Sequence, residues 1–258
     1  MSSRARLLFL VTSVVATCGS LRAGAILDDT TEETYAVGDH AKLTVRNTDG
    51  RVYVYGSEDN EITVKVYKRA FTKERLDQIS AKIKLEGDTM TIDTYYPPAP
   101  EGLFADRSGT VEYTILVPQN CEVSKVELSQ GEIQVEGLRG PGVDVHLTNG
   151  RINVKSCFTP MRLALGTGGI DIVYNWWEEL PFRLDASVDK GDVKLHFPPT
   201  AALKVDAATG KGHVRNYLLE DAERGDDVQT LQTPIGDGSD VEFKLRTNDG
   251  NIAIVKAY

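Results

Sequence analysis

The sequence is poor in aromatic residues and has no long apolar run beyond its N-terminus. Aromatic residues make up only 7% of the 258 residues, whereas there are 23 glycines. This balance favours a narrow aliphatic core with many tight turns over a large globular core. After residue 25, no apolar run approaches the ~20 residues that a membrane-spanning helix needs. We therefore expect a repetitive β protein with no transmembrane segment after signal removal.

Basic residues are also scarce relative to acidic ones. The whole chain has 29 Lys and Arg against 38 Asp and Glu. Loss of the first 25 residues would remove three arginines and no acidic residue, leaving 26 basic side chains and a net charge of −12. Such a surface repels phosphate backbones, which are bound by clustered Lys and Arg. No nucleic acid partner is expected.

The first 25 residues resemble a secretory signal peptide. Two arginines precede an apolar stretch at 7–16, and the small residues Ala-Gly-Ala end at Ala25. We expect cleavage after Ala25 and a secreted, periplasmic or cell-surface protein. The alternative is a lipoprotein signal ending at Cys18, but Thr17 departs from the small residue that such signals place before the cysteine.

One motif recurs along the chain, a glycine followed by alternating aliphatic residues, Gly-x-(Ile/Val)-x-(Val/Ile/Leu). From residue 131 onward the steps between motif glycines span 19 to 22 residues, and the last step, of 38, equals two such steps. We interpret the motif as the corner of a repeating rung, with one rung near the C-terminus replaced by a loop. The structural turn glycines predicted in this way are Gly50, Gly131, Gly150, Gly169, Gly191, Gly212 and Gly250.

An alternating apolar run precedes most of these glycines, as in VDVHL before Gly150. Period-two alternation indicates strands with one buried face, so each unit is strand, glycine corner, strand. Glycine suits the corner because a positive φ is resisted by a residue with a Cβ. A two-stranded unit is unstable alone and must stack on its neighbours. The predicted fold is an all-β, β-solenoid-like stack with an aliphatic ladder of Ile133, Ile152, Ile170, Val193 and Val214.

The N-terminal third departs from this pattern. The segment TKERLDQISAKIKLEG, which begins at Thr72, places apolar residues at helical spacing. We expect one short inserted helix at about 73–82, capped by Thr72 and covering an end or edge of the sheet. Strands resume at 89–96 and 110–118, where alternation returns.

The predicted domain organisation has a signal peptide at 1–25 and one continuous domain over 26–258. Within that domain, 26–122 is an irregular N-terminal β section, and 123–258 holds the regular rungs with a loop at about 216–239. This loop and the segment PPAPEGLFADRSG are candidate binding surfaces, because loops on a repeat scaffold usually carry recognition.

The ensemble of these features resembles a bacterial family of putative adhesin domains. The residues that carry the resemblance are the signal peptide, the inserted helix, the run ending in Val117-Pro118, the Gly-x-Ile-x-Val rungs and the closing IGDGSDVEFKLRTNDGNIAI. Beyond the signal peptide, the similarity covers nearly all of the mature chain, from about Leu43 to Val255. The resemblance implies a β-solenoid-like exported or surface protein, and it brings no catalytic residues or cofactors with it.

Residues that could carry chemistry do not converge in the sequence. The histidines (His40, His146, His196 and His213) occupy different positions relative to the rung glycines, so neither a catalytic nor a metal cluster is expected. Asp144, Asp185 and Asp206 hold equivalent positions in three rungs. Stacked carboxylates repel unless a basic side chain separates them or a hard cation such as calcium bridges them. A solvated outer face is the simpler interpretation.

Three residues form the candidate ligand-binding site. Trp176 and Trp177, followed by Glu178, could stack on a sugar if exposed, but neighbouring strand residues point in opposite directions, so only one tryptophan should face solvent.

Cys121 and Cys157 lie nearly two rungs apart, farther than the reach of a disulfide, so we expect them to be unpaired.

The leading functional hypothesis is a non-enzymatic surface or envelope protein that binds an envelope protein or glycan, or serves as a scaffold. The alternative is a carbohydrate-binding or carbohydrate-active protein that uses the tryptophan pair. No enzymatic activity, cofactor or metal is expected.

Overall fold

The computed structural model describes residues 26–38, 40–98, 101–102, 106–217, 228–237 and 240–256. The described residues form one sheet-like stack of fifteen strands with one short helix, α1 (Lys73–Gln78). The strands are β1 (Leu27–Ala36), β2 (Lys42–Ser57), β3 (Glu61–Ala70), β4 (Ser80–Glu86), β5 (Thr89–Tyr95), β6 (Thr110–Pro118), β7 (Glu122–Glu136), β8 (Val143–Lys155), β9 (Met161–Val173), β10 (Arg183–Phe197), β11 (Leu203–Lys211), β12 (Val214–Asn216), β13 (Thr230–Ile235), β14 (Glu242–Asp249) and β15 (Ile252–Lys256).

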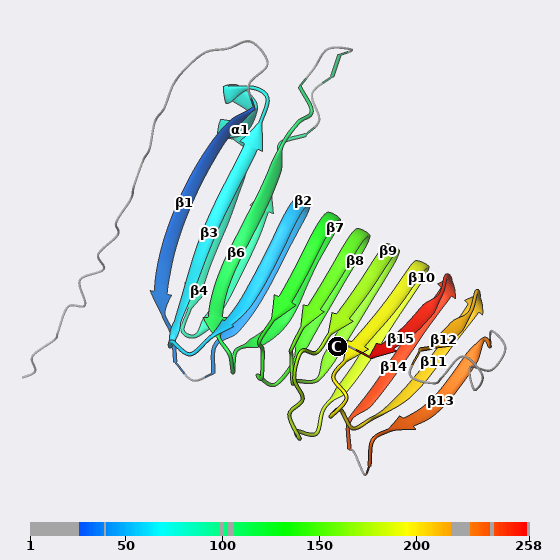
Figure 1. Cartoon of the computed structure of the whole chain (residues 1–258). Helices are drawn as coiled ribbons and strands as arrows, with labels where there is room; N and C mark the ends of the chain where they lie inside the picture. The colour runs from blue at the N-terminus through cyan, green and yellow to red at the C-terminus, as the bar shows by residue number, and fades with distance from the viewer. Residues whose placement is uncertain are drawn as a thin grey trace, which may run out of the picture.

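Five strands, β2 and β7 to β10, bend at a glycine into arches that stack in parallel (Figure 1). In each arch, the residues before the glycine form the first limb and those after it form the second limb. Their corner glycines pair in a single row, Gly50, Gly131, Gly150, Gly168 and Gly191. The all-β, solenoid-like architecture predicted from the alternation is therefore confirmed.

The core lies between the two limbs. In β8, Val145 and Leu147 on the first limb and Ile152 and Val154 on the second limb are buried, while the residues between them face outward. The same alternation repeats in the neighbouring arches. Burying one such aliphatic side chain is worth about 1.5–3 kcal/mol, and most of that burial comes from adjacent arches. Stability therefore belongs to the stack and not to the single arch.

One corner differs from the predicted one. Gly168, not Gly169, pairs with Gly150 and has a positive φ of 136°. Gly168 forms the corner because Ile170 stays in register with Ile152 in the core. In each arch the corner glycine lies two residues before this core residue, which places the corner at Gly168. The steps on either side of Gly168 therefore span 18 and 23 residues, outside the predicted range.

The C-terminal end is ordered differently from the predicted stack. Ile252 of β15 pairs with both Val193 and Val214, so β14 and β15 lie between β10 and the pair β11 and β12. The predicted ladder of Val193 directly on Val214 is thus wrong. The 38-residue step does not mark a lost rung, because the chain passes through the edge strand β13, antiparallel to β11, before it returns. Alternation identifies core-facing residues but does not encode the spatial order of strands.

The N-terminal end continues both limbs beyond β2. On the first limb, β5 pairs with β2 and β4 pairs with β5; on the second limb, β6 pairs with β2, β3 with β6, and β1 with β3. β5 and β6 match two predicted strands closely. β2 itself pairs with β7 from Lys42 to Tyr55, so the sheet is continuous across the predicted boundary between residues 122 and 123.

The inserted helix is shorter than predicted. Thr72 caps α1 as expected, its side chain accepting a hydrogen bond from the Arg75 amide at 3.3 Å, and α1 contacts β1 and β3 at the end of the stack. The helix ends at Gln78, however, and 80–86 forms β4. Apolar residues at Ala81, Ile83 and Leu85 alternate with period two and pack on the core, which outweighs their fit to a helix.

Some predicted features fall outside the described residues. The signal peptide at 1–25 lies there, as do 218–227 and 238–239 within the predicted loop at 216–239 and parts of PPAPEGLFADRSG. In the ranges that the structure describes, no helix is long and apolar enough to cross a membrane.

Candidate functional site

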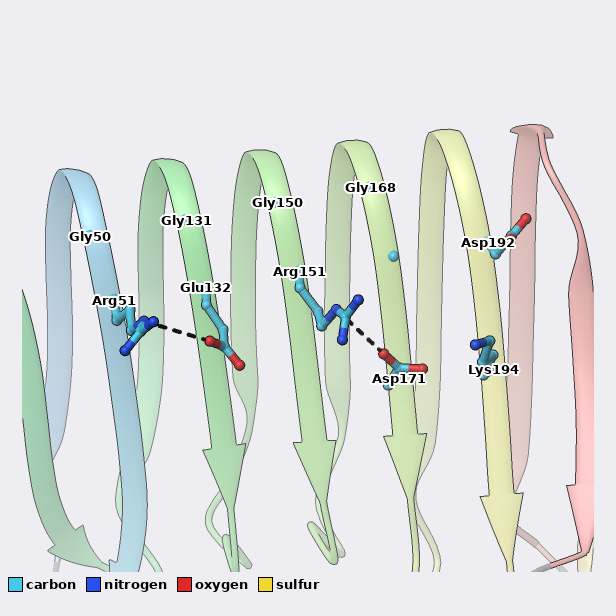
Figure 2. Close-up of a pocket in the computed structure, with 11 residues that line it drawn as sticks. Gly50, Arg51, Gly131, Glu132, Gly150, Arg151, Gly168, Asp171, Asp192 and Lys194 are labelled. Carbon is cyan, nitrogen blue, oxygen red and sulfur yellow. Dashed lines mark ion pairs between the residues drawn. The ribbon is translucent and has the colours of Figure 1, made fainter.

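Two surfaces of the stack have features suited to binding. The first, the glycine trough, runs along the row of corner glycines and has a volume of about 650 Å³ (Figure 2). Glycine is required there by close approach, since a Cβ on Gly150 would lie 1.8 Å from the carbonyl oxygen of Gly131. The trough is lined by Gly50, Arg51, Gly131, Glu132, Gly150, Arg151, Gly168, Gly169, Asp171, Asp192 and Lys194.

The charges of the trough alternate along the stack and balance one another. Arg51 lies 3.8 Å from Glu132, and Arg151 lies 3.8 Å from Asp171, as the dashed lines in Figure 2 mark. Half or more of each arginine side chain is exposed, so these long ion pairs are weak. The trough offers donors and acceptors at strand spacing, but its described lining holds no histidine, cysteine or hydroxyl side chain for nucleophilic chemistry.

The second surface, the tryptophan edge, comprises Gln119, Arg139, Phe158, Trp176 and Glu178. Gln119 lies in the connection from β6 to β7, and the other residues lie in the connections that join one arch to the next, at the ends of the limbs far from the corner glycines. The connections stack on one another, as the Arg139 amide donates to the Gln119 carbonyl oxygen at 2.6 Å and the Phe158 amide donates to the Leu138 carbonyl oxygen at 2.9 Å. Residues far apart in sequence are thereby brought together.

Trp176 is the exposed centre of this edge. Its side chain is 47% exposed, and its indole Nε1 donates a hydrogen bond to Glu178 Oε1 at 2.9 Å. Glu178 in turn receives two hydrogen bonds from Arg139, through Nε at 3.0 Å and through Nη2. The guanidinium of Arg139 lies 5.6 Å from the centre of the Phe158 ring. Trp176 is thus held in one orientation while its ring faces solvent.

Trp177 has the opposite environment. It packs against the core, with its ring centre 5.4 Å from that of Tyr174 and 6.2 Å from that of Phe182. Trp176 is thus exposed and Trp177 partly buried, but not through the alternation of a strand, because both lie in the connection between β9 and β10. Phe243 and the buried Phe158, which also belongs to the tryptophan edge, complete this aromatic cluster. This cluster supports Trp176 from below, because Phe158 also contacts Trp176 at 6.0 Å.

Arg139 and Gln119 were not among the predicted site residues. Arg139 donates to Gln119 Oε1 at 2.9 Å and so links that amide to the Glu178 carboxylate. The sequence contains only an indirect indication that Arg139 and Glu178 meet. They occupy connections two rungs apart and carry opposite charges. A repeat with irregular connections does not show which loop residues will meet.

The Arg139–Glu178 pair shapes the electrostatics of the edge. Hydrogen bonds from Arg139 hold the pKa of the Glu178 carboxyl below its usual value, and the same bonds raise the pKa of Arg139. Both side chains are about 30% exposed or less. The pair therefore stays charged at neutral pH and orients the indole without moving protons.

The three equivalent aspartates lie on the outer face of the first limb. In register, the row reads Asp144, Arg162, Asp185, Lys244 and Asp206, so a basic residue separates each pair of carboxylates. Each aspartate also has a basic neighbour, His146 at 2.8 Å, Arg183 at 3.4 Å and Arg246 at 2.6 Å respectively. Among the described residues there is no group of three or more His, Cys, Asp or Glu that could hold a metal ion.

The two cysteines among the described residues are buried and unpaired. Cys121 and Cys157 both have no exposed surface, and neither forms a disulfide, as expected from their separation along the stack. Burial raises the pKa of both thiols to about 12. They are core side chains and not nucleophiles.

The fold and these surfaces define a class of protein, a β-solenoid-like stack of glycine-cornered arches. The chain belongs to the Toastrack DUF4097 family, whose model matches residues 19–255. Among curated proteins, no match was found.

The chain is similar to solved structures of low sequence identity. A protein from Clostridium sporogenes described as a putative cell adhesion protein is 15% identical, covers 89% of this chain and 100% of its own, and aligns with a TM-score of 0.50. A putative adhesin from Bacteroides fragilis is 10% identical and covers 88% of this chain and 97% of its own, with a TM-score of 0.30. At 15% identity, the likeness to the Clostridium sporogenes protein concerns the fold alone.

Proposed function

We propose that this protein is an exported, non-enzymatic binding protein of the cell surface or envelope, and that the tryptophan edge is its contact surface. The observation that carries the proposal is the exposed indole of Trp176, held by Glu178 and Arg139 over an aromatic base. The adhesin descriptions of proteins with this fold agree with a surface role.

A solvent-facing tryptophan that is already oriented suits binding in two ways. Tryptophan and arginine dominate the energetic centres of protein interfaces, because they combine a large apolar area with directional polar groups. Fixing the ring before contact also reduces the entropy that binding would otherwise lose. On this edge the ring is fixed by interactions within the protein, so a partner can cover the exposed face without displacing them.

A carbohydrate ligand is the second candidate. The exposed face of Trp176 could stack on a sugar ring, and the hydrogen bonds that connect Trp176 through Glu178 to Arg139 and Gln119 bring further polar groups to the same edge, where they could bind hydroxyls. The carboxylate of Glu178 is already engaged by Arg139 and Trp176, which favours binding of a sugar over cleavage of one.

The test compares binding of the exported protein to envelope fractions from its own source with binding of the Trp176→Ala variant. We expect Trp176→Ala to lose most binding. Phe71→Ala is the matched control, since Phe71 is 64% exposed in the helix-bearing end of the stack and should be replaceable without effect. Equal binding by both variants and the wild type would reject the tryptophan edge as the contact surface.

A glycan array distinguishes the two ligand classes. Reproducible glycan binding that Trp176→Ala abolishes would identify a carbohydrate ligand. Binding to envelope fractions that persists after glycans are removed enzymatically, yet still requires Trp176, would identify a protein partner.

A further inference from the structure

At its N-terminal end the stack has two strands with an open side, β4 on the first limb and β1 on the second, and β1 pairs with β3 on one side only. Nine of its ten residues are exposed, and Tyr35 is half-buried, so β1 adds no fully buried side chain to the core. On its other side, the described chain places no strand. The backbone groups along that edge are therefore available to a further strand. Open sheet edges of this kind can cause aggregation or bind an extended peptide as an added strand.

The side chains of β1 are strongly acidic. Asp28, Asp29, Glu32 and Glu33 are four of its ten residues, and the strand has no basic residue. Three of the four face basic residues of β3 in the antiparallel register, as Arg69 lies opposite Asp28, Lys68 opposite Asp29 and Lys65 opposite Glu32. Lys68 Nζ is 2.9 Å from Asp29 Oδ2. β1 is thus already held by a basic strand on its inner side.

The acidic residues are distributed over both faces of β1. Side chains alternate along a strand, so Asp28 and Glu32 share one face and Asp29 and Glu33 share the other. Within each face the two carboxylates are four residues apart, which is about 13 Å along a strand. A strand added to the open edge would meet two carboxylates on each of its faces.

A second copy of this chain is a poorer partner for the open edge than a segment with four spaced basic residues. Its open strand β4 has Lys82 and Lys84 only two residues apart, so only one of them can lie directly opposite a carboxylate that recurs every four residues. If two β1 strands paired antiparallel with Thr30 opposite Thr31, Asp28 would face Glu33 and Asp29 would face Glu32, and like charges directly opposite are destabilising. At the other end of the stack, β13 (TLQTPI) has no basic residue to offer and includes Pro234, which lacks a backbone donor.

We propose that the open edge of β1 is a docking edge for an extended, lysine- or arginine-rich segment of another protein, which adds to the sheet as a strand. Backbone hydrogen bonds would supply affinity common to any sequence, and the four carboxylates would select basic residues. The spacing of the carboxylates specifies the preferred pattern, two adjacent basic residues, two spacers and two further basic residues. This surface is separate from the tryptophan edge and does not depend on its function.

The test uses two end-capped peptides of ten residues, each with six threonines and four lysines. In the matched peptide, two lysine pairs are separated by two threonines; in the control peptide, all four lysines are consecutive. Fluorescence anisotropy with the exported protein should show saturable binding of the matched peptide, with an affinity roughly five- to tenfold higher than that of the control peptide. Hydrogen exchange should slow at 27–36 when the matched peptide is bound.

Two double variants with the same change of charge test the location. Asp28→Asn with Glu32→Gln should weaken binding of the matched peptide about five- to tenfold, because two cross-strand charge pairs are lost. Glu58→Gln with Glu74→Gln, at exposed positions outside β1, should leave it unchanged. All four positions are exposed, so both variants should fold, which far-UV circular dichroism verifies.

Three results would overturn the proposal. They are the absence of saturable binding at millimolar peptide, equal affinity for the two peptides, and equal affinity in the two double variants. The last two would mean that the peptide is attracted by the net charge of the protein and not by β1.

Discussion

The carbonyl oxygen of Gly150 occupies the space where a side chain of Gly168 would begin, since a Cβ on Gly168 would lie 1.8 Å from it. The adjacent Gly169 has no such constraint, and the nearest atom to its added Cβ is the Asp192 carbonyl oxygen at 3.8 Å. Two neighbouring glycines in the same corner therefore differ completely in what they tolerate.

We expect Gly168→Ala to lower the free energy of unfolding by at least about 3 kcal/mol, because backbone strain at positive φ adds to a clash with neighbouring backbone. Gly169→Ala is the matched control and should change it by less than about 1 kcal/mol. Urea unfolding followed by circular dichroism measures both. Similar losses in the two variants would contradict the assignment of the corner to Gly168.

The ion pair beneath Trp176 should make its fluorescence insensitive to mild acid. The pKa of Glu178 is lowered by Arg139 from its ordinary value of 4.5, so the stabilisation from this pair is fully present above that value and is lost only as the pH falls through the lower folded-state pKa. The measurement uses a Trp177→Phe variant, in which Trp176 is the only tryptophan. We expect constant Trp176 emission from pH 7 to about 5 and a change at lower pH. A transition centred at pH 6 would show that the carboxylate is not held in this way.

Glu178→Gln isolates the contribution of the charge. The variant keeps the shape of the side chain but removes the titrating group, so the acid transition in Trp176 emission should disappear. Persistence of the same transition would assign it to another group.

Thiol labelling should distinguish the native from the unfolded protein. Burial raises the pKa of Cys121 and Cys157 from 9.0 to about 12, so almost no thiolate is present at pH 8 and neither sulfur is accessible. The experiment uses a protein of residues 26–258, which lacks Cys18. An aromatic disulfide reagent should label neither thiol in the native state and both thiols in denaturant. Rapid labelling of either cysteine without denaturant would mean that its connection opens.

The charge row on the first limb predicts a salt-dependent effect at Arg162. Arg162 lies in register between Asp144 and Asp185, so Arg162→Glu would align three carboxylates. We expect a loss of about 1 kcal/mol in the free energy of unfolding at low salt, and a smaller loss at high salt, where exposed charges are screened. Arg162→Gln, which removes the charge without reversing it, should lose less. Equal losses at both ionic strengths would indicate a packing effect instead.

The sheet could be predicted from the sequence wherever alternation was local and uninterrupted. β6 and most of β5 follow from alternating residues, and the arches follow from the glycine motif, because a two-residue period leaves one face that must be buried. The helix was only half predicted, since Ile79 and Ile83 satisfy a helical spacing and a period-two pattern at once. Packing of Ile83 against the core decided between them.

The tryptophan edge was predicted only in part, for a different reason. Trp176, Trp177 and Glu178 are neighbours in sequence, so their proximity was visible. Arg139 lies 39 residues before Glu178 and reaches it only because successive connections stack. No local pattern records such a contact.

The sequence by itself determined that this chain is a stack of glycine-cornered rungs, because each buried face and each corner is set by residues within a few positions of one another. Tertiary structure alone decided the order of the last strands, the use of Gly168 at its corner and the meeting of Arg139 with Glu178. These depend on which rungs lie side by side, and that choice is made by burial and backbone pairing across the whole stack.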